Sequence, residues 1–401
     1  MLTILENAKR LYQLKLNQTL PDYKRYLFVA LAQSQAKITA VYGSRGIGKT
    51  TLLMQLLQDS TIAPADKLYI SCDHASLAGV SLFDFVDEFS KRGGKLIAID
   101  EVHEAQNFEQ ELKSIYDFLD IKVYFTGSSA LHLSSPDFAR RYSMYHLYPL
   151  SFREYLELSF NLKLMPLTLA RVFADHENRV PAIIHALPDK KILQYYNDFI
   201  NAGAYPFYFE DKDKYTDRII ETINTILHTD LIKLFAIQPD KIDTLKKLLL
   251  TVCVSKPLEL SIDKLAATVG ITKSTLYKYI SYLHDAELLR YVIYEGKRFA
   301  AIRKPDKLYL ANTNLFNALC LNSDMGTKRE TFFASMLSVD HSLYYVTKGD
   351  FLIDEKYTIE IGGKNKGFKQ IKDIPDAYIA ADDIESGYAN KIPLWLFGFL
   401  Y

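Results

Sequence analysis

Residues 41–51 read Val41-Tyr-Gly-Ser-Arg-Gly-Ile-Gly-Lys-Thr-Thr51 and match the pattern G-x-x-x-x-G-K-[ST] at every required position. Residues 37–42 before this loop have the composition of a buried strand, and residues 50–57 after it have the apolar spacing of a helix. This strand-loop-helix context is the one in which the pattern marks a phosphate-binding loop. A glycine-rich turn without a ligand is the weaker alternative. The stretch therefore predicts a nucleotide site.

The residue types in this loop suit phosphate groups. Glycines allow the backbone to approach a ligand closely, so that N–H groups and the N-terminus of the next helix face phosphate oxygens. Lys49 would reach the β- and γ-phosphates, and the Thr50 hydroxyl would complete the shell of a Mg²⁺ ion. We expect the nucleotide to be held by Gly43, Ser44, Arg45, Gly46, Ile47, Gly48, Lys49, Thr50 and Thr51.

Length and composition indicate a globular chain of two or three domains. Hydrophobic residues make up 49% of the 401 residues, which is enough for packed cores. Lys plus Arg and Asp plus Glu both number 48, so the overall charge gives no support for binding a polyanion. No run of about 18 apolar residues occurs, and we expect no membrane span. The three cysteines are far apart and include no C-x-x-C pair, which fits a reducing cytoplasm.

Strand and helix patterns alternate after the loop. Strands are predicted at residues 67–72, 95–99 and 121–125, with helical patterns between them. Such alternation predicts a mainly parallel sheet with helices on both faces and ligands at the carboxyl ends of the strands. Two further helices are expected before the sheet, in residues 1–35.

Polar side chains follow two of these strands. The second strand after the loop ends in Asp100 and Glu101. Asp100 would hold Mg²⁺ through the Thr50 hydroxyl or a water, and Glu101 is placed to orient and deprotonate an attacking water. That role suits hydrolysis better than phosphoryl transfer to another hydroxyl. The next strand ends near Thr126 and Ser128, whose hydroxyls could sense the γ-phosphate or the water, with an ordinary polar turn as the alternative.

With these motifs, residues 35–155 resemble the AAA-type P-loop ATPase family, in a bacterial and archaeal branch with a distinctive C-terminal region. Tyr148-Pro-Leu-Ser-Phe-Arg-Glu-Tyr155 and Gly203-Ala-Tyr-Pro206 are similar to signatures of that branch. The resemblance implies ATP as the nucleotide and an arginine that reaches its γ-phosphate. Arg140 and Arg141 are at the corresponding place, and a structural ion pair is the alternative. Such an arginine would act within the chain or from a neighbour in a homo-oligomer.

The sequence of residues 159–401 predicts further domains after the ATPase core. Residues 159–250 carry helical patterns and few converging polar groups, which indicates a helical linker. Residues 251–312 resemble a winged helix-turn-helix with a turn at Gly270 and a wing over residues 291–299. In a DNA reader the second helix would enter the major groove. A purely protein-binding use is equally open. The exposed residues of that helix would be Thr272, Lys273, Ser274, Thr275 and Lys278.

Residues 313–401 resemble a restriction-nuclease-like fold of the PD-(D/E)xK type but depart from its pattern. Asp354 and Glu360 are close together in sequence, and Gly362 stands where the pattern has a lysine. Without that lysine, a scissile phosphate and its attacking water lose a positioned cation. Lys364 is a possible substitute. We expect a retained fold without DNA cleavage.

The sequence thus predicts an α/β P-loop NTPase core at residues 36–158, with N-terminal helices before it and a helical linker, a winged helix and a small α/β nuclease-like domain after it. The leading hypothesis is a slow ATPase whose nucleotide state controls the C-terminal domains. A nucleotide-gated interaction or transcription-control module without hydrolysis is the alternative, and an ATP-dependent nuclease would need the tail acids to work. DNA, another protein and a second copy of the chain are candidate partners.

Overall fold

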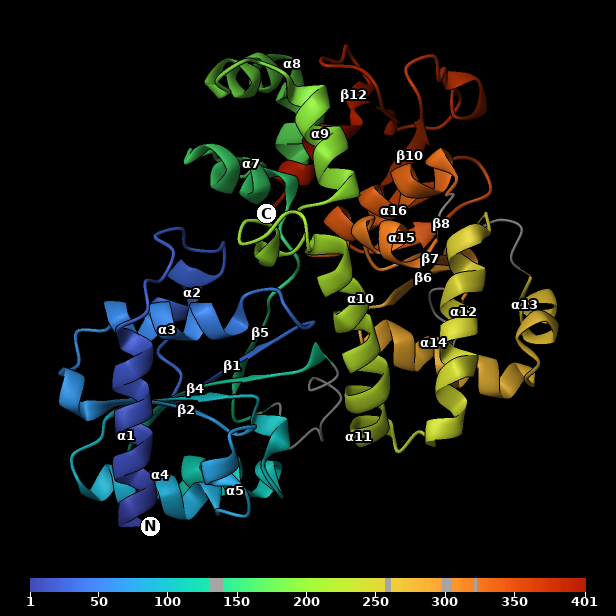
Figure 1. Cartoon of the computed structure of the whole chain (residues 1–401). Coiled ribbons are helices and arrows are strands. Elements are labelled where there is room, and N and C mark those ends of the chain that lie inside the picture. Colours follow the sequence, from blue (N-terminus) through green and yellow to red (C-terminus); the bar gives the residue numbers. More distant parts are fainter. Residues whose placement is uncertain (130–139, 257–260, 298–304, 321–322) are drawn as a thin grey trace. The chain divides into compact units, whose positions relative to one another are not determined.

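The chain forms two compact units, Met1–Tyr148 and Pro149–Tyr401 (Figure 1). Each unit is built around a sheet of its own. Among the described residues, no helix combines the length and the apolar content needed to cross a bilayer. The computed structural model describes residues 1–129, 140–256, 261–297, 305–320 and 323–401.

The sheet of the first unit has five parallel strands in the order β2-β3-β4-β1-β5. The predicted parallel sheet is therefore confirmed. Since β4 lies between β1 and β3, the loop after β1, the hydroxyls after β4 and the acids after β3 share one edge of the sheet. β5 has no apolar run and was not predicted. The strands are β1 (Ile38–Tyr42), β2 (Lys67–Ser71), β3 (Leu96–Asp100), β4 (Lys122–Gly127) and β5 (Ser143–His146).

Helices flank this sheet. Figure 1 shows α2 and α3 on one side of the sheet and α4 and α5 on the other, while α1 packs against the edge strand β2. In α1, the buried residues Leu5, Ala8 and Tyr12 repeat at helical spacing and form the stripe that faces the core. The helices are α1 (Leu2–Leu16), α2 (Phe28–Ala32), α3 (Lys49–Asp59), α4 (Leu82–Lys91) and α5 (Phe108–Phe118).

In the described part of the second unit, seven strands form a mixed sheet in the order β12-β11-β10-β9-β8-β6-β7. Strand β6 pairs antiparallel with β7 on one side and parallel with β8 on the other. The strands are β6 (Leu289–Tyr294), β7 (Lys307–Leu310), β8 (Leu343–Tyr345), β9 (Phe351–Ile353), β10 (Tyr357–Gly362), β11 (Ala377–Ala381) and β12 (Lys391–Pro393).

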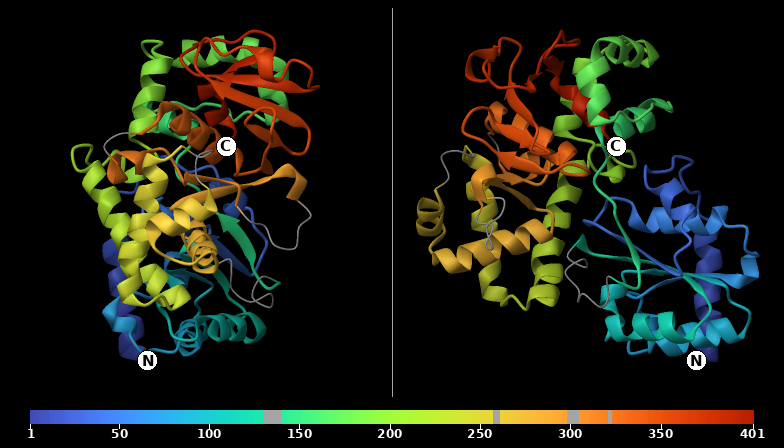
Figure 2. Two further views of the ribbon diagram at one scale, coloured as in Figure 1. Left: turned by 90° about the vertical axis from the view of Figure 1, so that its right-hand side faces the viewer. Right: turned by 180° about the vertical axis from the view of Figure 1, so that it is seen from behind.

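The helices of the second unit enclose an aromatic core. The ring of Phe152 is fully buried, and its centroid lies 6.4 Å from that of Trp395 and 6.1 Å from that of Phe399. In both views of Figure 2 the end of the chain lies beside α7 and α8. The helices are α7 (Phe152–Phe160), α8 (Leu169–Ala186), α9 (Ile192–Asn201), α10 (Tyr215–Thr225), α11 (Leu231–Phe235), α12 (Ile242–Val254), α13 (Ile262–Val269), α14 (Lys273–Asp285), α15 (Asn314–Leu319) and α16 (Met325–Leu337).

A helix-turn-helix is present where the sequence predicted one. Helix α13 ends at Gly270, whose φ of 83° lies in the left-handed region, and the Thr272 hydroxyl caps α14. The predicted wing over residues 291–299 begins with β6, while Arg298 and Phe299 lie outside the described residues. Because β6 also pairs with β8, strands from the helix-turn-helix region and from the tail belong to one sheet within the second unit.

Two of the three cysteines are paired. Cys253, in the last turn of α12, forms a disulfide with Cys320, which is 67 residues further along the chain. Cys72 is the free cysteine. The sequence spacing gave no sign of this bond, because the two cysteines meet only through the packing of α12 against α15. The pairing removes the support that the cysteines gave for a reducing compartment.

Candidate functional site

The phosphate loop joins β1 to α3. Gly48, the residue before α3, has a φ of 96°, in the left-handed region that favours glycine. A Cβ at Gly43 would lie 2.2 Å from the carbonyl oxygen of Leu147 and 2.6 Å from Cδ1 of Ile47. A larger residue at position 43 would therefore collide with the backbone after β5, so the conformation of the phosphate loop requires glycine there.

Lys49 lies under this loop with only 5% of its surface exposed. Its Nζ donates to the carbonyl oxygens of Gly43 at 2.7 Å and Ser44 at 2.8 Å. An ammonium group has three N–H donors, so these bonds leave one donor for an anion. The Ser44 Oγ is buried and has no hydrogen-bond partner among the described residues. Since buried hydroxyls are almost always bonded, a phosphate oxygen is a fitting partner for it.

An arginine that the sequence analysis did not select fixes the same loop. Arg25, between α1 and α2, is 7% exposed. Its Nη1 donates to the carbonyl oxygen of Ile47 and its Nη2 to that of Tyr148, both at 2.7 Å. The guanidinium thus joins the loop to the end of the first unit.

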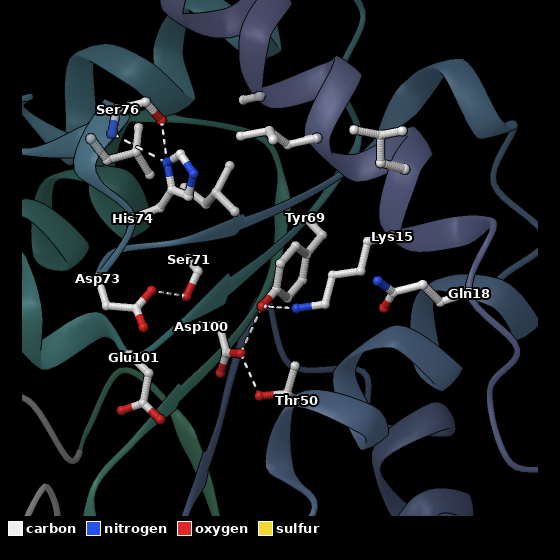
Figure 3. Close-up of a pocket in the computed structure, with 15 residues that line it drawn as sticks. Lys15, Gln18, Thr50, Tyr69, Ser71, Asp73, His74, Ser76, Asp100 and Glu101 are labelled. Atoms are coloured by element: carbon white, nitrogen blue, oxygen red, sulfur yellow. Dashed lines mark hydrogen bonds between the residues drawn. The ribbon is translucent and has the colours of Figure 1, made fainter.

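The acid at the end of β3 is at the centre of a set of hydroxyl groups (Figure 3). The Oδ2 atom of Asp100 accepts hydrogen bonds from Thr50 Oγ1 at 2.6 Å and from the Tyr69 hydroxyl at 2.8 Å. Its Oδ1 atom accepts one from Thr126 Oγ1. Asp100 is 2% exposed. The structure thus brings the predicted Thr50, Asp100 and Thr126 together, and this oxygen set has the chemistry that Mg²⁺ prefers.

Glu101 follows with an unusual backbone conformation. Its φ is 49°, a left-handed value that is uncommon for a side chain of this kind. Its N–H donates to Thr126 Oγ1 at 3.1 Å, and its carboxylate lies 3.5 Å from His103 Nε2. The nearby Ser128 Oγ, after β4, is buried without a hydrogen-bond partner in the described residues. Strained conformations of this kind cluster at active sites.

Tyr69 and Lys15 also belong to this group, although the sequence analysis missed both. The Lys15 Nζ donates to the Tyr69 hydroxyl oxygen at 2.7 Å. Burial, together with the Asp100 charge, raises the pKa of Tyr69 far above its usual value, so the phenol keeps its proton. Helical spacing places Lys15, three residues after Tyr12, beside the buried stripe of α1, but this spacing gives no sign of the contact with Tyr69.

A cavity of about 540 Å³ opens beside these groups. Figure 3 shows it between α1 and the ends of β2 and β3. Apolar side chains of α1 line one wall. The polar residues that matter for its chemistry are Lys15, Gln18, Thr50, Asp73, Asp100 and Glu101.

The two candidate arginines lie on the chain just before β5. The Nε of Arg141 is 3.6 Å from Oδ1 of Asp117, at the end of α5. Arg140 is exposed. A role for either arginine at the γ-phosphate stays a prediction.

On the predicted DNA-binding helix and in the predicted wing, part of the positive charge is already paired. Lys273 forms an ion pair with Asp263, and Lys297 forms one with Asp306. Lys278 is exposed. These pairs reduce the positive charge available to a phosphate backbone.

The tail differs from the sequence-based expectation. Asp354 lies in the turn between β9 and β10, where its carboxylate contacts His341 Nδ1 at 2.6 Å and accepts from Ser342 N at 2.9 Å. The acid near β10 is instead Asp350, whose Oδ2 accepts from Ile361 N at 2.7 Å. Placing Asp354 in the candidate nuclease site was therefore wrong, because the tight turn after β9 directs it to a different set of partners.

A lysine fills the space beside Gly362. A Cβ at Gly362 would lie 2.7 Å from both Cβ and Cγ of Lys366, and the Lys366 ammonium contacts the carboxylate of the buried Glu360. The Nζ atom of Lys364, the substitute suggested by the sequence, lies 3.5 Å from Oδ2 of Asp383. The lysine next to Glu360 is therefore Lys366 and not Lys364.

The loop, the Thr50–Asp100 pair and the strand order define a P-loop nucleotide-binding domain. Comparison with known families agrees with this class, since residues 35–156 match the AAA domain family (AAA_14). The match supports an AAA-type P-loop ATPase domain and, with it, ATP binding. Residues 193–327 match a domain of unknown function (DUF8612).

The individual proteins that are similar to this chain have low sequence identity to it. The uncharacterized protein MJ1637 of Methanocaldococcus jannaschii is 28% identical over 371 residues, which cover 85% of this chain and 78% of that protein. The Walker-type ATPase PABY2304 of Pyrococcus abyssi is 15% identical with a TM-score of 0.43, covering 73% of this chain and 93% of that one. AMPPCP-bound DnaA from Aquifex aeolicus is 15% identical with a TM-score of 0.26, covering 70% and 91%.

Proposed function

We propose that the first unit binds Mg²⁺ and ATP and hydrolyses the nucleotide slowly. The observation that carries this proposal is the hydrogen bond of 2.6 Å between Thr50 Oγ1 and Asp100 Oδ2, directly after the phosphate loop and next to Glu101. Phosphate, metal and water each have a residue of the required chemistry at one edge of the sheet.

The residues would divide the work as follows. Lys49 and the loop N–H groups bind the β- and γ-phosphates, and Thr50 and Asp100 hold Mg²⁺, which when bound neutralises charge on those phosphates. The Glu101 carboxylate orients a water and accepts its proton as the water attacks the γ-phosphate. Ser44 donates a hydrogen bond to a phosphate oxygen, which gives its buried hydroxyl a partner.

We further propose that the nucleotide state controls the second unit. The matched AAA region continues to residue 156, into α7 of the second unit. At that point Ser151 Oγ and Arg153 Nε both donate to the carbonyl oxygen of Tyr401 at 2.9 Å. The end of the AAA match is thereby built into the packing of the second unit, which offers a route for coupling. Duplex DNA is the partner that we propose for that unit, at α14, where the Lys278 side chain is exposed.

Phosphate release from purified protein tests the proposal, with ATP and GTP and with and without duplex DNA. Glu101→Gln should bind ATP as the wild type does but release no phosphate. Glu88→Gln is a matched control, because Glu88 lies on the surface of α4 in an ion pair with Arg92. Wild-type turnover in Glu101→Gln would disprove the role of Glu101. Binding without any hydrolysis by the wild type would favour a nucleotide-gated module.

A further inference from the structure

The Asp100 carboxylate is fixed at both of its oxygens. Oδ1 is held by Thr126 from β4, and Oδ2 is held by Thr50 from α3 and by Tyr69 from β2. Three different elements therefore set its orientation, and rotation about its Cβ–Cγ bond would break at least one of these bonds. A carboxylate held in this way presents its remaining lone pairs in fixed directions.

The direction of the Tyr69 hydrogen bond is set by α1. A phenol has one O–H donor, and an ammonium group can only donate. The Lys15 Nζ donates to the phenol oxygen at 2.7 Å and lies 4.0 Å from the centroid of the tyrosine ring. The single proton of Tyr69 is therefore left for Asp100 Oδ2. Figure 3 shows Lys15, Tyr69, Asp100 and Thr50 as one connected chain of groups.

We propose that Tyr69 and Lys15 are positioning residues that hold Asp100 in its metal-binding orientation, which makes helix α1 part of the Mg²⁺ site. This inference rests on the proposed function. Nothing in the phosphate-loop pattern or the acidic strand end assigns a role to either residue. Lys15 donates to Tyr69, and Tyr69 donates to Asp100, so the hydrogen bonds lead from α1 to the carboxylate by way of the phenol.

A purely structural role would have a different consequence. If the Lys15–Tyr69 contact only ties α1 to the edge of the sheet, its loss lowers stability but leaves the metal requirement of nucleotide binding unchanged. If the pair positions Asp100, its loss raises the metal concentration needed, while binding of metal-free nucleotide, which depends on the phosphate loop, is unaffected. The metal requirement separates the two roles.

The test uses the full chain and ADP, so that no turnover interferes. Calorimetry gives the ADP affinity at a series of free Mg²⁺ concentrations and in EDTA, and electron paramagnetic resonance counts bound Mn²⁺. Tyr69→Phe, which removes one oxygen, should raise the half-saturating metal concentration by about 10- to 100-fold, the effect typical of losing a partner of a metal ligand. Lys15→Met should change it in the same direction. Lys9→Met is the matched control, because Lys9 lies on the same helix in a surface pair with Glu6.

Each outcome has a definite meaning. Wild-type metal dependence in Tyr69→Phe, with a lower melting temperature, would overturn the inference and leave the proposed function intact. A wild type that binds no nucleotide at any metal concentration would overturn both. Should Tyr69→Phe fail to fold, the Lys15→Met and Lys9→Met pair decides the question, since an equal metal requirement in these two variants would refute the role.

Discussion

Replacing Lys49 with methionine would keep a chain of similar length under the phosphate loop and remove only its charge and its donors. In the structure the Lys49 ammonium already gives two of its three N–H groups to the carbonyl oxygens of Gly43 and Ser44. One donor is therefore available to a phosphate without loosening the loop. The expected loss is that of a single charge-assisted hydrogen bond.

The size of the effect follows from that count. A hydrogen bond between charged groups contributes about 1.5–3 kcal/mol, and every 1.4 kcal/mol changes a dissociation constant about tenfold. We therefore expect Lys49→Met to bind ATP roughly 10- to 150-fold more weakly than the wild type. If the loop opened so that all three donors turned to the phosphates, the loss would be several times larger in free energy.

Isothermal titration with ATP and Mg²⁺ measures this difference, with thermal melting as the check on folding. Lys24→Met is the control, because Lys24 is exposed and pairs with Asp59 on the surface. Equal ATP affinity in Lys49→Met and the wild type would refute the assignment of the loop. A loss of the same size in Lys24→Met would show that the effect is not specific to the site.

Four further outcomes are expected. Arg140→Ala or Arg141→Ala should reduce turnover much more than ATP affinity, because a cation at the γ-phosphate stabilises charge that develops in the transition state; recovery on mixing with the phosphate-loop variant would indicate an arginine supplied by a neighbour. Cys253→Ser should lower the free energy of unfolding by up to about 4 kcal/mol, from the 67-residue loop that the disulfide closes, and a thiol reductant should abolish the difference. Lys278→Ala should lower the log–log salt slope of duplex binding, measured by fluorescence anisotropy, by about one, and absence of binding at low salt would remove DNA as a partner. Plasmid DNA should stay intact with Mg²⁺ or Mn²⁺, because Gly362 stands where the pattern has its lysine and the Lys366 ammonium is already paired with the Glu360 carboxylate instead of being left to hold a scissile phosphate; cleavage that is lost in Glu360→Ala would restore the nuclease hypothesis.

The centre of the first unit could be predicted because its chemistry is encoded locally. The phosphate-loop residues 43–51 have fixed spacing. Asp100 ends an apolar strand, and one strand-helix unit separates that strand from the phosphate-loop unit. Tyr69 and Lys15 could not be assigned in this way. Each is an ordinary residue of a strand or a helix, and their meeting depends on how α1 packs against β2. A tertiary contact of this kind leaves no fixed spacing in the sequence.

In the tail, residues 313–401, the sequence analysis chose the wrong acid and the wrong lysine for a different reason. Asp354 was selected from the sequence alone, as an acid on an expected strand close before Glu360. A tight turn separates β9 from β10, with Asp354 and Glu355 both at positive φ, and this turn places Asp350 across the hairpin from β10. Similarly, Lys366 reaches Glu360 only because the chain turns back after Gly362. The spacing of residues along the sequence does not show in which direction side chains point at a turn, so these contacts could not be predicted from it.

The position of β6 between β7 and β8 limits how the second unit can move. A hinge between the helix-turn-helix and the tail would need a segment that few contacts cross, whereas here main-chain hydrogen bonds cross on both sides of β6. The helix-turn-helix and the tail should therefore move together as one rigid body. A fragment that ends at residue 312 would also uncover the edge of β6 that β8 occupies, and a bare strand edge is a template for pairing with other chains. Single substitutions on α14 will separate the roles of these parts more cleanly than truncation.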